Sequence, residues 1–154
     1  MSSLARVFKT ENRLAKIARS PGGKTIEEAV ASAEQRIESV RDKCVAALAG
    51  KAERLAKIAA GDRGAGAAET LDGLYNTSNA IFGVACVYDL DALSEAACSL
   101  CDLVHGFRSG EPVNWQAIDV HVDGMRLLAA GYTEGAETIL EGLRRVKARF
   151  VPAT

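Results

Sequence analysis

The sequence predicts an all-α protein, an up-down four-helix bundle with additional N-terminal and C-terminal helices. Of its 154 residues, 48% are apolar and 25% charged, which is a globular composition. Prolines occur only at positions 21, 112 and 152, so long helices meet few breakers. Short connections separate segments of helical period, and such connections favour antiparallel neighbours. The length corresponds to one domain of roughly 100–200 residues.

The first 20 residues predict a basic amphipathic helix. One broad face carries Leu4, Val7, Phe8, Leu14 and Ile17, and Arg6, Lys9, Arg13, Lys16 and Arg19 lie mostly elsewhere. Such a helix can lie on an anionic membrane or dock on an acidic partner. Residues 64–123 hold nine Asp and Glu against the single cation Arg108. We therefore expect this helix to cover the chain's own bundle, and contact with a membrane surface is not expected.

Residues 25–154 form the predicted bundle domain, which begins with a long helix. Thr25 and Glu28 have the spacing of a capping box. Apolar residues then recur in steps of four and three on one stripe: Ile26, Val30, Ala33, Ile37, Val40, Cys44 and Ala47. A helix to Ala60 would have about 36 residues and a length of roughly 54 Å. Because this is long for one small domain, we expect either a bend at Gly50 or an end that packs on something else.

Four further helices follow from turn and cap residues. We expect the first at 67–87 and the second from an N-cap at Asp89 or Asp91 to His105. The third is expected at 115–130 with Asn114 as N-cap, and the fourth from Thr133 to about Phe150. Residues 118–123 alternate like a strand, but their embedding in a helical pattern favours helix.

Charge and hydropathy limit the possible locations and partners. A net charge of −1 argues against a general nucleic-acid binder. The start of the chain lacks the apolar run of a signal peptide, and the longest uncharged stretch, Gly73–Tyr88, falls short of a membrane span. We expect a cytoplasmic protein whose four cysteines are reduced thiols, with Cys98 and Cys101 packed in the core.

The helix at 67–87 carries the candidate site. Its core arc is predicted to comprise Leu71, Leu74, Ser78, Ile81 and Ala85. The opposite arc collects Asp72, Asn76, Asn79, Gly83 and Cys86, flanked by Tyr75 and Phe82. A mid-helix glycine costs roughly 1 kcal/mol against alanine, which implies a close approach at Gly83. An exposed aromatic pair beside this glycine predicts a partner-binding surface of these seven residues. Alternatively, the N-terminal helix or a second subunit covers the face.

Residues 79–93 resemble the central helix–turn–helix of histidine phosphotransfer (HPt) domains, which carry a His-x-x-Lys-Gly signature. Asn79 stands in the place of the phosphorylated histidine, Phe82 replaces the lysine, and Gly83 matches the glycine. An amide nitrogen has its lone pair delocalised and cannot carry a phosphoryl group. The resemblance therefore implies an HPt-like bundle without its acceptor, with a response regulator or histidine kinase domain as partner.

A second resemblance, to small chemotaxis-cluster proteins of the CheE type, extends from Phe8 through Pro21–Gly23 to Leu128. It rests on residues 78–85, 99–103 and 120–128. It implies a role in tuning chemotaxis signalling.

Cysteine and histidine residues offer the remaining chemistry. Cys98 and Cys101 have C-x-x-C spacing with His105 four residues on, but the second ligand pair of a strong zinc signal is missing, so we expect no metal and no cofactor. His121 lies between Asp119 and Asp123, an acidic neighbourhood that would favour its charged form. We expect this histidine to be structural.

The function predicted from the sequence is a non-catalytic protein-binding module of bacterial two-component or chemotaxis signalling. No Gly-rich phosphate cradle, nucleophile elbow or paired-histidine motif points to an enzyme. Two alternatives stay open. One is a homodimeric structural protein that buries the long helix and the same face between subunits. The other is a phosphotransfer protein that uses His105 or His121.

Overall fold

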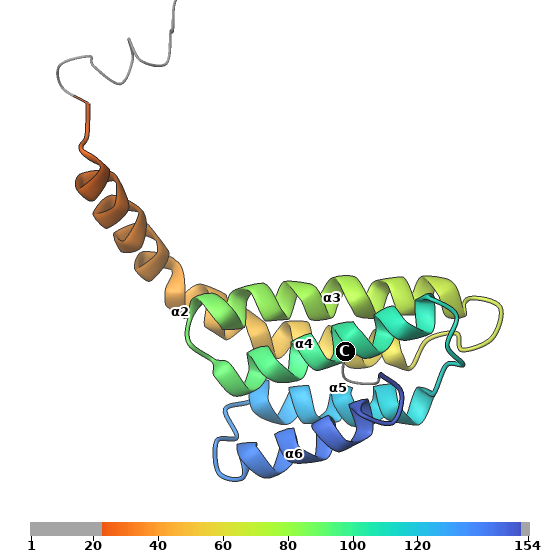
Figure 1. Cartoon of the computed structure of the whole chain (residues 1–154). Coiled ribbons are helices and arrows are strands. Elements are labelled where there is room, and N and C mark those ends of the chain that lie inside the picture. The colour runs from red at the N-terminus through yellow and green to blue at the C-terminus, as the bar shows by residue number, and fades with distance from the viewer. Residues whose placement is uncertain (1–22, 152–154) are drawn as a thin grey trace, which may run out of the picture. The chain divides into compact units, whose positions relative to one another are not determined.

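The computed structural model describes residues 23–151, and these residues form five helices and no strand. The helices are α2 (Ile26–Ala59), α3 (Ala67–Val87), α4 (Asp91–Arg108), α5 (Trp115–Ala129) and α6 (Ala136–Lys147) (Figure 1). The all-α prediction is confirmed, and residues 118–123 are helical as expected. The predicted helix over residues 1–20 lies outside the described residues. None of the described helices is long and apolar enough to cross a membrane.

The chain divides into two units, whose described parts are residues 23–39 and 40–151. In the first unit the capping box is confirmed. The Thr25 backbone N–H donates to Glu28 Oε2 at 2.8 Å, and the Glu28 N–H donates to Thr25 Oγ1 at 3.2 Å. These two bonds satisfy backbone donors that have no partner inside the helix, so α2 begins where the sequence predicts.

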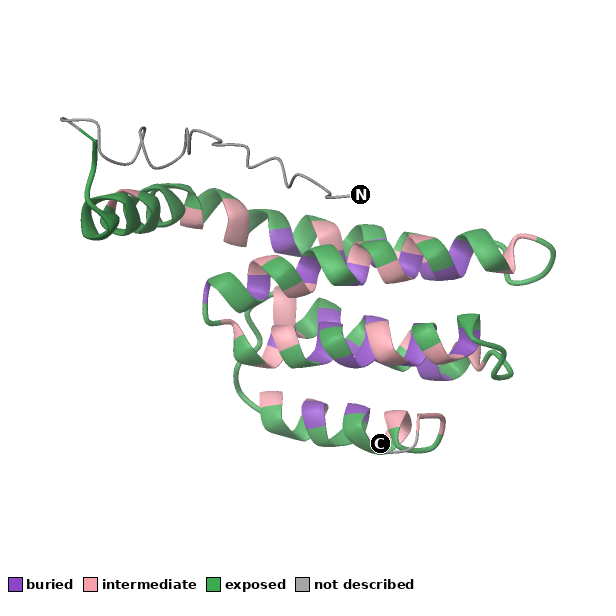
Figure 2. Ribbon diagram, turned by 45° about the horizontal axis from the view of Figure 1, so that its top comes forward, coloured by how far each residue is buried: buried purple, intermediate pink, exposed green. Residues whose placement is uncertain are grey.

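The second unit contains one hydrophobic core that all five helices line. The helix α4 packs against α3, α5 and α6, and α5 also packs against α6. The part of α2 in this unit adds Leu48, Leu55 and Ala59. Figure 2 shows in purple the buried positions along the packed helices. Successive helices of the unit run in opposite directions (Figure 1). Helix α2 runs through Gly50 without a break, and the burial of its last turns agrees with the expectation that its end packs on other elements.

The predicted N-cap of α4 is wrong. Leu90 occupies the N-cap position and Asp91 is the first helical residue, while Asp89 adopts a left-handed conformation with φ of +57°. No side chain caps this helix. The helix ends at Arg108, not at His105, because the buried Phe107 continues the core face. The Phe107 ring packs edge-on against the Phe150 ring, with 5.9 Å between the two ring centres.

The last helix is also shorter than predicted. It begins at Ala136 after Gly135, whose φ is +83°, and it ends at Lys147. Gly131 is likewise left-handed, with φ of +85°. These two left-handed glycines allow the chain to turn between α5 and α6 in a loop that is longer than predicted. Thr133 therefore lies in this loop, and its side chain does not cap α6.

The Asn114 cap is confirmed and gives a stability prediction. Asn114 Oδ1 accepts a hydrogen bond from the Ala117 N–H at 2.9 Å. Replacing Asn114 with alanine removes this bond, so the free energy of unfolding should fall by about 1 kcal/mol. Thr133→Ala is the matched control, since Thr133 does not cap α6, and its effect should stay within about 0.5 kcal/mol. Urea unfolding of both variants provides the measurement, and equal losses would contradict the assignment.

Candidate functional site

The core-facing arc of α3 is as the sequence predicts. Leu71, Leu74, Ser78, Ile81 and Ala85 are all buried. The Ser78 hydroxyl donates to the carbonyl oxygen of Ala97 in α4 at 2.9 Å, which satisfies the polar group in this arc. The burial of this arc turns the other side of α3 outward.

The outward side contains most of the predicted site residues, but its two aromatic side chains are not fully exposed. Asp72, Asn76, Asn79, Gly83 and Cys86 are exposed. Tyr75 and Phe82 are partly buried and pack against the core. The predicted exposed aromatic pair is therefore wrong. Both rings lie at the border of the core arc, where packing against the core covers part of their surface.

Arg108, at the end of α4, contacts the first part of this side. Its Nε lies 2.9 Å from Asp72 Oδ1, and its guanidinium carbon lies 5.1 Å from the centre of the Tyr75 ring. Sequence reasoning missed this contact, although Arg108 is the single cation between residues 64 and 123. The charge of Asp72 is thus compensated within the protein.

Beyond this ion pair lies a surface that we call the outer face of α3. Its residues are exposed and uncharged: Asn76, Asn79, Ala80, Gly83, Cys86 and Val87. A Cβ built on Gly83 would meet no described atom within 4 Å. The close approach inferred at Gly83 is therefore not made by the described part of the chain.

Close approaches within the bundle occur at two other glycines. A Cβ on Gly73 of α3 would lie 3.1 Å from Ile58 Cγ2 of α2. A Cβ on Gly124 of α5 would lie 3.2 Å from Ile139 Cγ2 and 3.3 Å from Leu143 Cδ1, both in α6. Helix packing explains Gly73 and Gly124 but leaves Gly83 without such an explanation.

His121 is part of the buried core. Its Nδ1 lies 2.8 Å from the Ala117 carbonyl oxygen, and its Nε2 lies 3.0 Å from Ser99 Oγ. Because a carbonyl only accepts, Nδ1 carries the proton and Nε2 accepts from the Ser99 hydroxyl. With the ring fully buried, a phosphoryl donor could reach Nε2 only if the helices separated.

The predicted charged form of His121 is wrong. Burial lowers the pKa of His121, and the positive charge of Lys147 lowers it further. The two acidic neighbours are engaged elsewhere. Asp119 lies 2.6 Å from Arg63, and Asp123 lies 3.6 Å from Arg126. Their carboxylates therefore do not stabilise an imidazolium.

Cys98 and Cys101 do not lie fully in the core, contrary to the prediction. Cys86 and Cys98 are exposed, and Cys44 and Cys101 are intermediate. Partial desolvation by the neighbouring protein atoms raises the pKa of both Cys98 and Cys101, which disfavours the reactive thiolate. His105, the remaining member of the possible zinc triplet, is exposed. Within residues 23–151, no group of three or more His, Cys, Asp or Glu side chains could hold a metal ion.

Comparison with known proteins gives no match: no family model, no curated protein and no solved structure matches this chain.

The burial of His121 predicts a pH dependence of stability. The folded-state pKa lies below the usual value of 6.5, so the unfolded chain binds this proton more readily. The stabilisation is fully present above pH 6.5 and is lost as the pH falls from there through the folded-state pKa. Urea midpoints should therefore fall between pH 7.5 and pH 5.5, and His121→Gln should reduce that fall.

Replacing His105 with glutamine serves as the control, because it removes a histidine that is exposed and lies outside the core. A His121→Gln variant that lost as much stability as the wild type over this range would contradict the assignment.

Proposed function

We propose that this protein is a non-catalytic binding module of bacterial two-component or chemotaxis signalling, and that the outer face of α3 docks a response regulator or a histidine kinase domain. One observation carries the proposal: six exposed, uncharged residues share one helix face around a glycine with open space.

The absence of charge on this face supports docking. No Asp, Glu, Lys or Arg occurs between Asp72 and Asp89. By contrast, the exposed positions of α6 are mostly charged: Glu137, Glu141, Arg144 and Arg145. The centres of protein interfaces are depleted of charged residues, since a charge that loses its hydration must find a partner. A partner can cover the outer face of α3 without that cost.

The shape of the face supports the same conclusion. Ala80, Gly83 and Cys86 have small side chains, so a partner can approach the backbone of α3 closely. Phe82, partly buried beside them, adds apolar area at the border of the face. Glycine in the middle of a helix lowers helix stability relative to alanine. A docking site explains a glycine at position 83, where no described residue packs against the helix.

The class of partner is inferred from the HPt resemblance. In that resemblance, Asn79, Phe82 and Gly83 correspond to the face through which HPt domains meet their partners. The assignment as non-catalytic follows from the amide of Asn79, which cannot accept a phosphoryl group. The buried position of His121 supports it further.

The substitution Gly83→Arg tests the docking face. An arginine there projects from the face, and we expect it to weaken partner binding by about tenfold or more. The fold should persist, since arginine is a better helix former than glycine and a Cβ at this position meets no described atom within 4 Å. Binding is measured by calorimetry against purified receiver and kinase domains of the two-component systems of the same cell.

Gly142→Arg is the matched control. Gly142 is also an exposed helical glycine with no described atom within 4 Å of its Cβ position, but it lies in α6. This variant should bind as the wild type does. If no receiver or kinase domain binds, or if both variants bind equally well, the proposal is wrong.

A second candidate function, a homodimeric structural protein, is favoured by the apolar stripe in the first unit. The side chains of Ile26, Val30 and Ile37 are 80%, 50% and 46% exposed. With Ala33 they follow the four-three spacing of a coiled-coil seam, and β-branched residues suit the seam of a two-stranded coil. A second copy of α2 would bury this stripe.

The solution mass of the full chain tests this candidate. A homodimer should dissociate when Ile26 and Val30 are both replaced by glutamate, because charges would then lie in the seam. Ala31→Glu with Gln35→Glu adds the same charge outside the stripe and should leave the dimer intact. A wild-type chain that sediments as a monomer at micromolar concentration would rule the candidate out. Dissociation by Gly83→Arg would instead assign the dimer contact to α3.

A further inference from the structure

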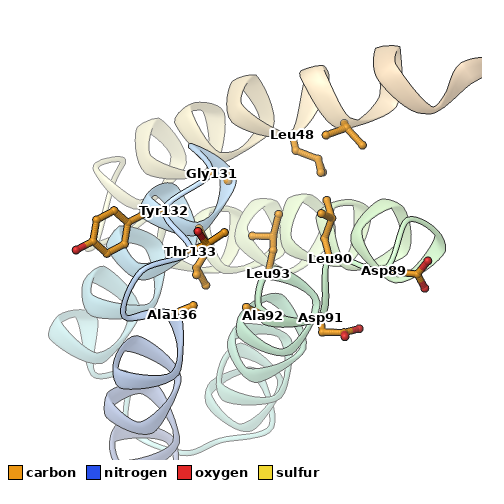
Figure 3. A pocket seen from close by; sticks show the side chains of 13 residues that line it. Leu48, Asp89, Leu90, Asp91, Ala92, Leu93, Gly131, Tyr132, Thr133 and Ala136 are labelled. Carbon is orange, nitrogen blue, oxygen red and sulfur yellow. The ribbon is translucent and has the colours of Figure 1, made fainter.

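A cavity at one end of the second unit is independent of the outer face of α3. It measures about 280 Å³ and lies where α2, the α3–α4 turn and the α5–α6 loop meet (Figure 3). The side chains of Leu48, Leu90 and Leu93 line one part of it. Small residues, among them Gly131 and Ala136, line another part and leave the volume open.

The size of the cavity sets the size of its ligand. An apolar cavity of about 150 Å³ holds benzene, so a volume near twice that suits a bicyclic ring or an alkyl chain of similar bulk. The leucine side chains offer no hydrogen-bonding groups, so the part of the ligand that lies against them must be apolar. Tyr132 and Thr133 add hydroxyl groups elsewhere in the lining.

The charged residues of the lining are both acidic. Asp89 and Asp91 belong to it, and no Lys, Arg or His among residues 23–151 does. Neither carboxylate forms an ion pair among the described residues. The guanidinium of Arg41, outside the lining, stacks on Tyr88 at 5.6 Å and donates to the Tyr88 carbonyl oxygen at 3.4 Å. The two carboxylates of the lining therefore favour a positively charged ligand.

The backbone of Asp89 gives an independent reason to connect this residue with a ligand. The Leu90 N–H donates to the Ala85 carbonyl oxygen at 3.0 Å, which closes α3 as in a Schellman motif. Asp89 then occupies the left-handed position that glycine normally takes, and it is the single non-glycine residue with positive φ in the described chain. A carboxylate held at this conformational cost beside a cavity points to a binding role.

We propose that this cavity binds a small amphiphilic cation, with its apolar body between the leucine side chains and its ammonium group beside Asp89 and Asp91. Asp91 also lies in the first turn of α4, where a helix favours acidic residues, so Asp89 is the more specific of the two.

Three probes that share one ring system but differ in charge test the proposal: tryptamine, indole and indole-3-acetate. Dissociation constants of the full chain are measured by NMR titration at low salt. We expect tryptamine to bind about fivefold more tightly than indole, the gain of one partly exposed ion pair, and indole-3-acetate to bind more weakly than indole. Shift changes should concentrate on the methyl groups of Leu48, Leu90 and Leu93.

Two variants separate the charge from the cavity. Asp89→Asn combined with Asp91→Asn should bring the three dissociation constants together while indole binding persists. Glu111→Gln, in the α4–α5 loop, removes one exposed carboxylate outside the cavity and should keep the wild-type order. Wild-type affinities that do not depend on charge, no saturable binding, or shift changes elsewhere would each overturn the proposal.

Asp89→Gly distinguishes a binding role from a structural one. Glycine relieves the left-handed conformation, so the urea midpoint should rise while the affinity for tryptamine falls. A variant that is more stable and binds tryptamine as tightly as the wild type would show that Asp89 has no part in binding.

Discussion

The second unit depends on the burial of α4. Ala96, Ala97 and Leu100 of this helix are completely buried, and α4 packs against α3, α5 and α6. Alanine residues allow neighbouring helices to approach closely, and polar groups in these contacts must be paired, as Ser78 is with the Ala97 carbonyl and Ser99 with His121. Because α4 fixes which side of α3 is covered, it also fixes which side of α3 is left for a partner.

The sequence predicts the elements well where the signals are local. The capping box of Thr25 and Glu28 and the glycines after Ala60 place α2 and α3 within one residue of their bounds. The predicted N-cap of α4 is wrong because a carboxylate caps a helix only when its residue has the backbone conformation of the N-cap position. The closure of α3 places Asp89 in a left-handed conformation, so Leu90 takes the cap position. The predicted start of α6 is wrong for a related reason, since two left-handed glycines lengthen the loop between α5 and α6.

The candidate site is predictable only in part, because its character depends on contacts distant in sequence. Helical periodicity identifies the outward side of α3, yet it does not reveal that Arg108 pairs with Asp72 or that packing covers part of Tyr75 and Phe82. The cavity beside Asp89 has no local sequence pattern at all, because four helices and two connections contribute to it. The neighbouring Asp119 and Asp123 predict a charged His121, but burial of the ring lowers its pKa.

Glycine contrasts support assigning the outer face of α3 to a partner. Gly73 and Gly124 lie where α2 and α6 come within 3.4 Å of a potential Cβ, so packing inside the protein accounts for both. Gly83 carries the same helical cost without such a neighbour among the described residues. Gly50 and Gly142 are similarly open, and they show that an open glycine alone does not define a site. What distinguishes Gly83 is its setting in a run of sixteen residues without charge, Gly73–Tyr88, on a helix whose outward side is exposed. A partner that covers this face therefore displaces water from small and apolar groups and leaves no ionic group unpaired.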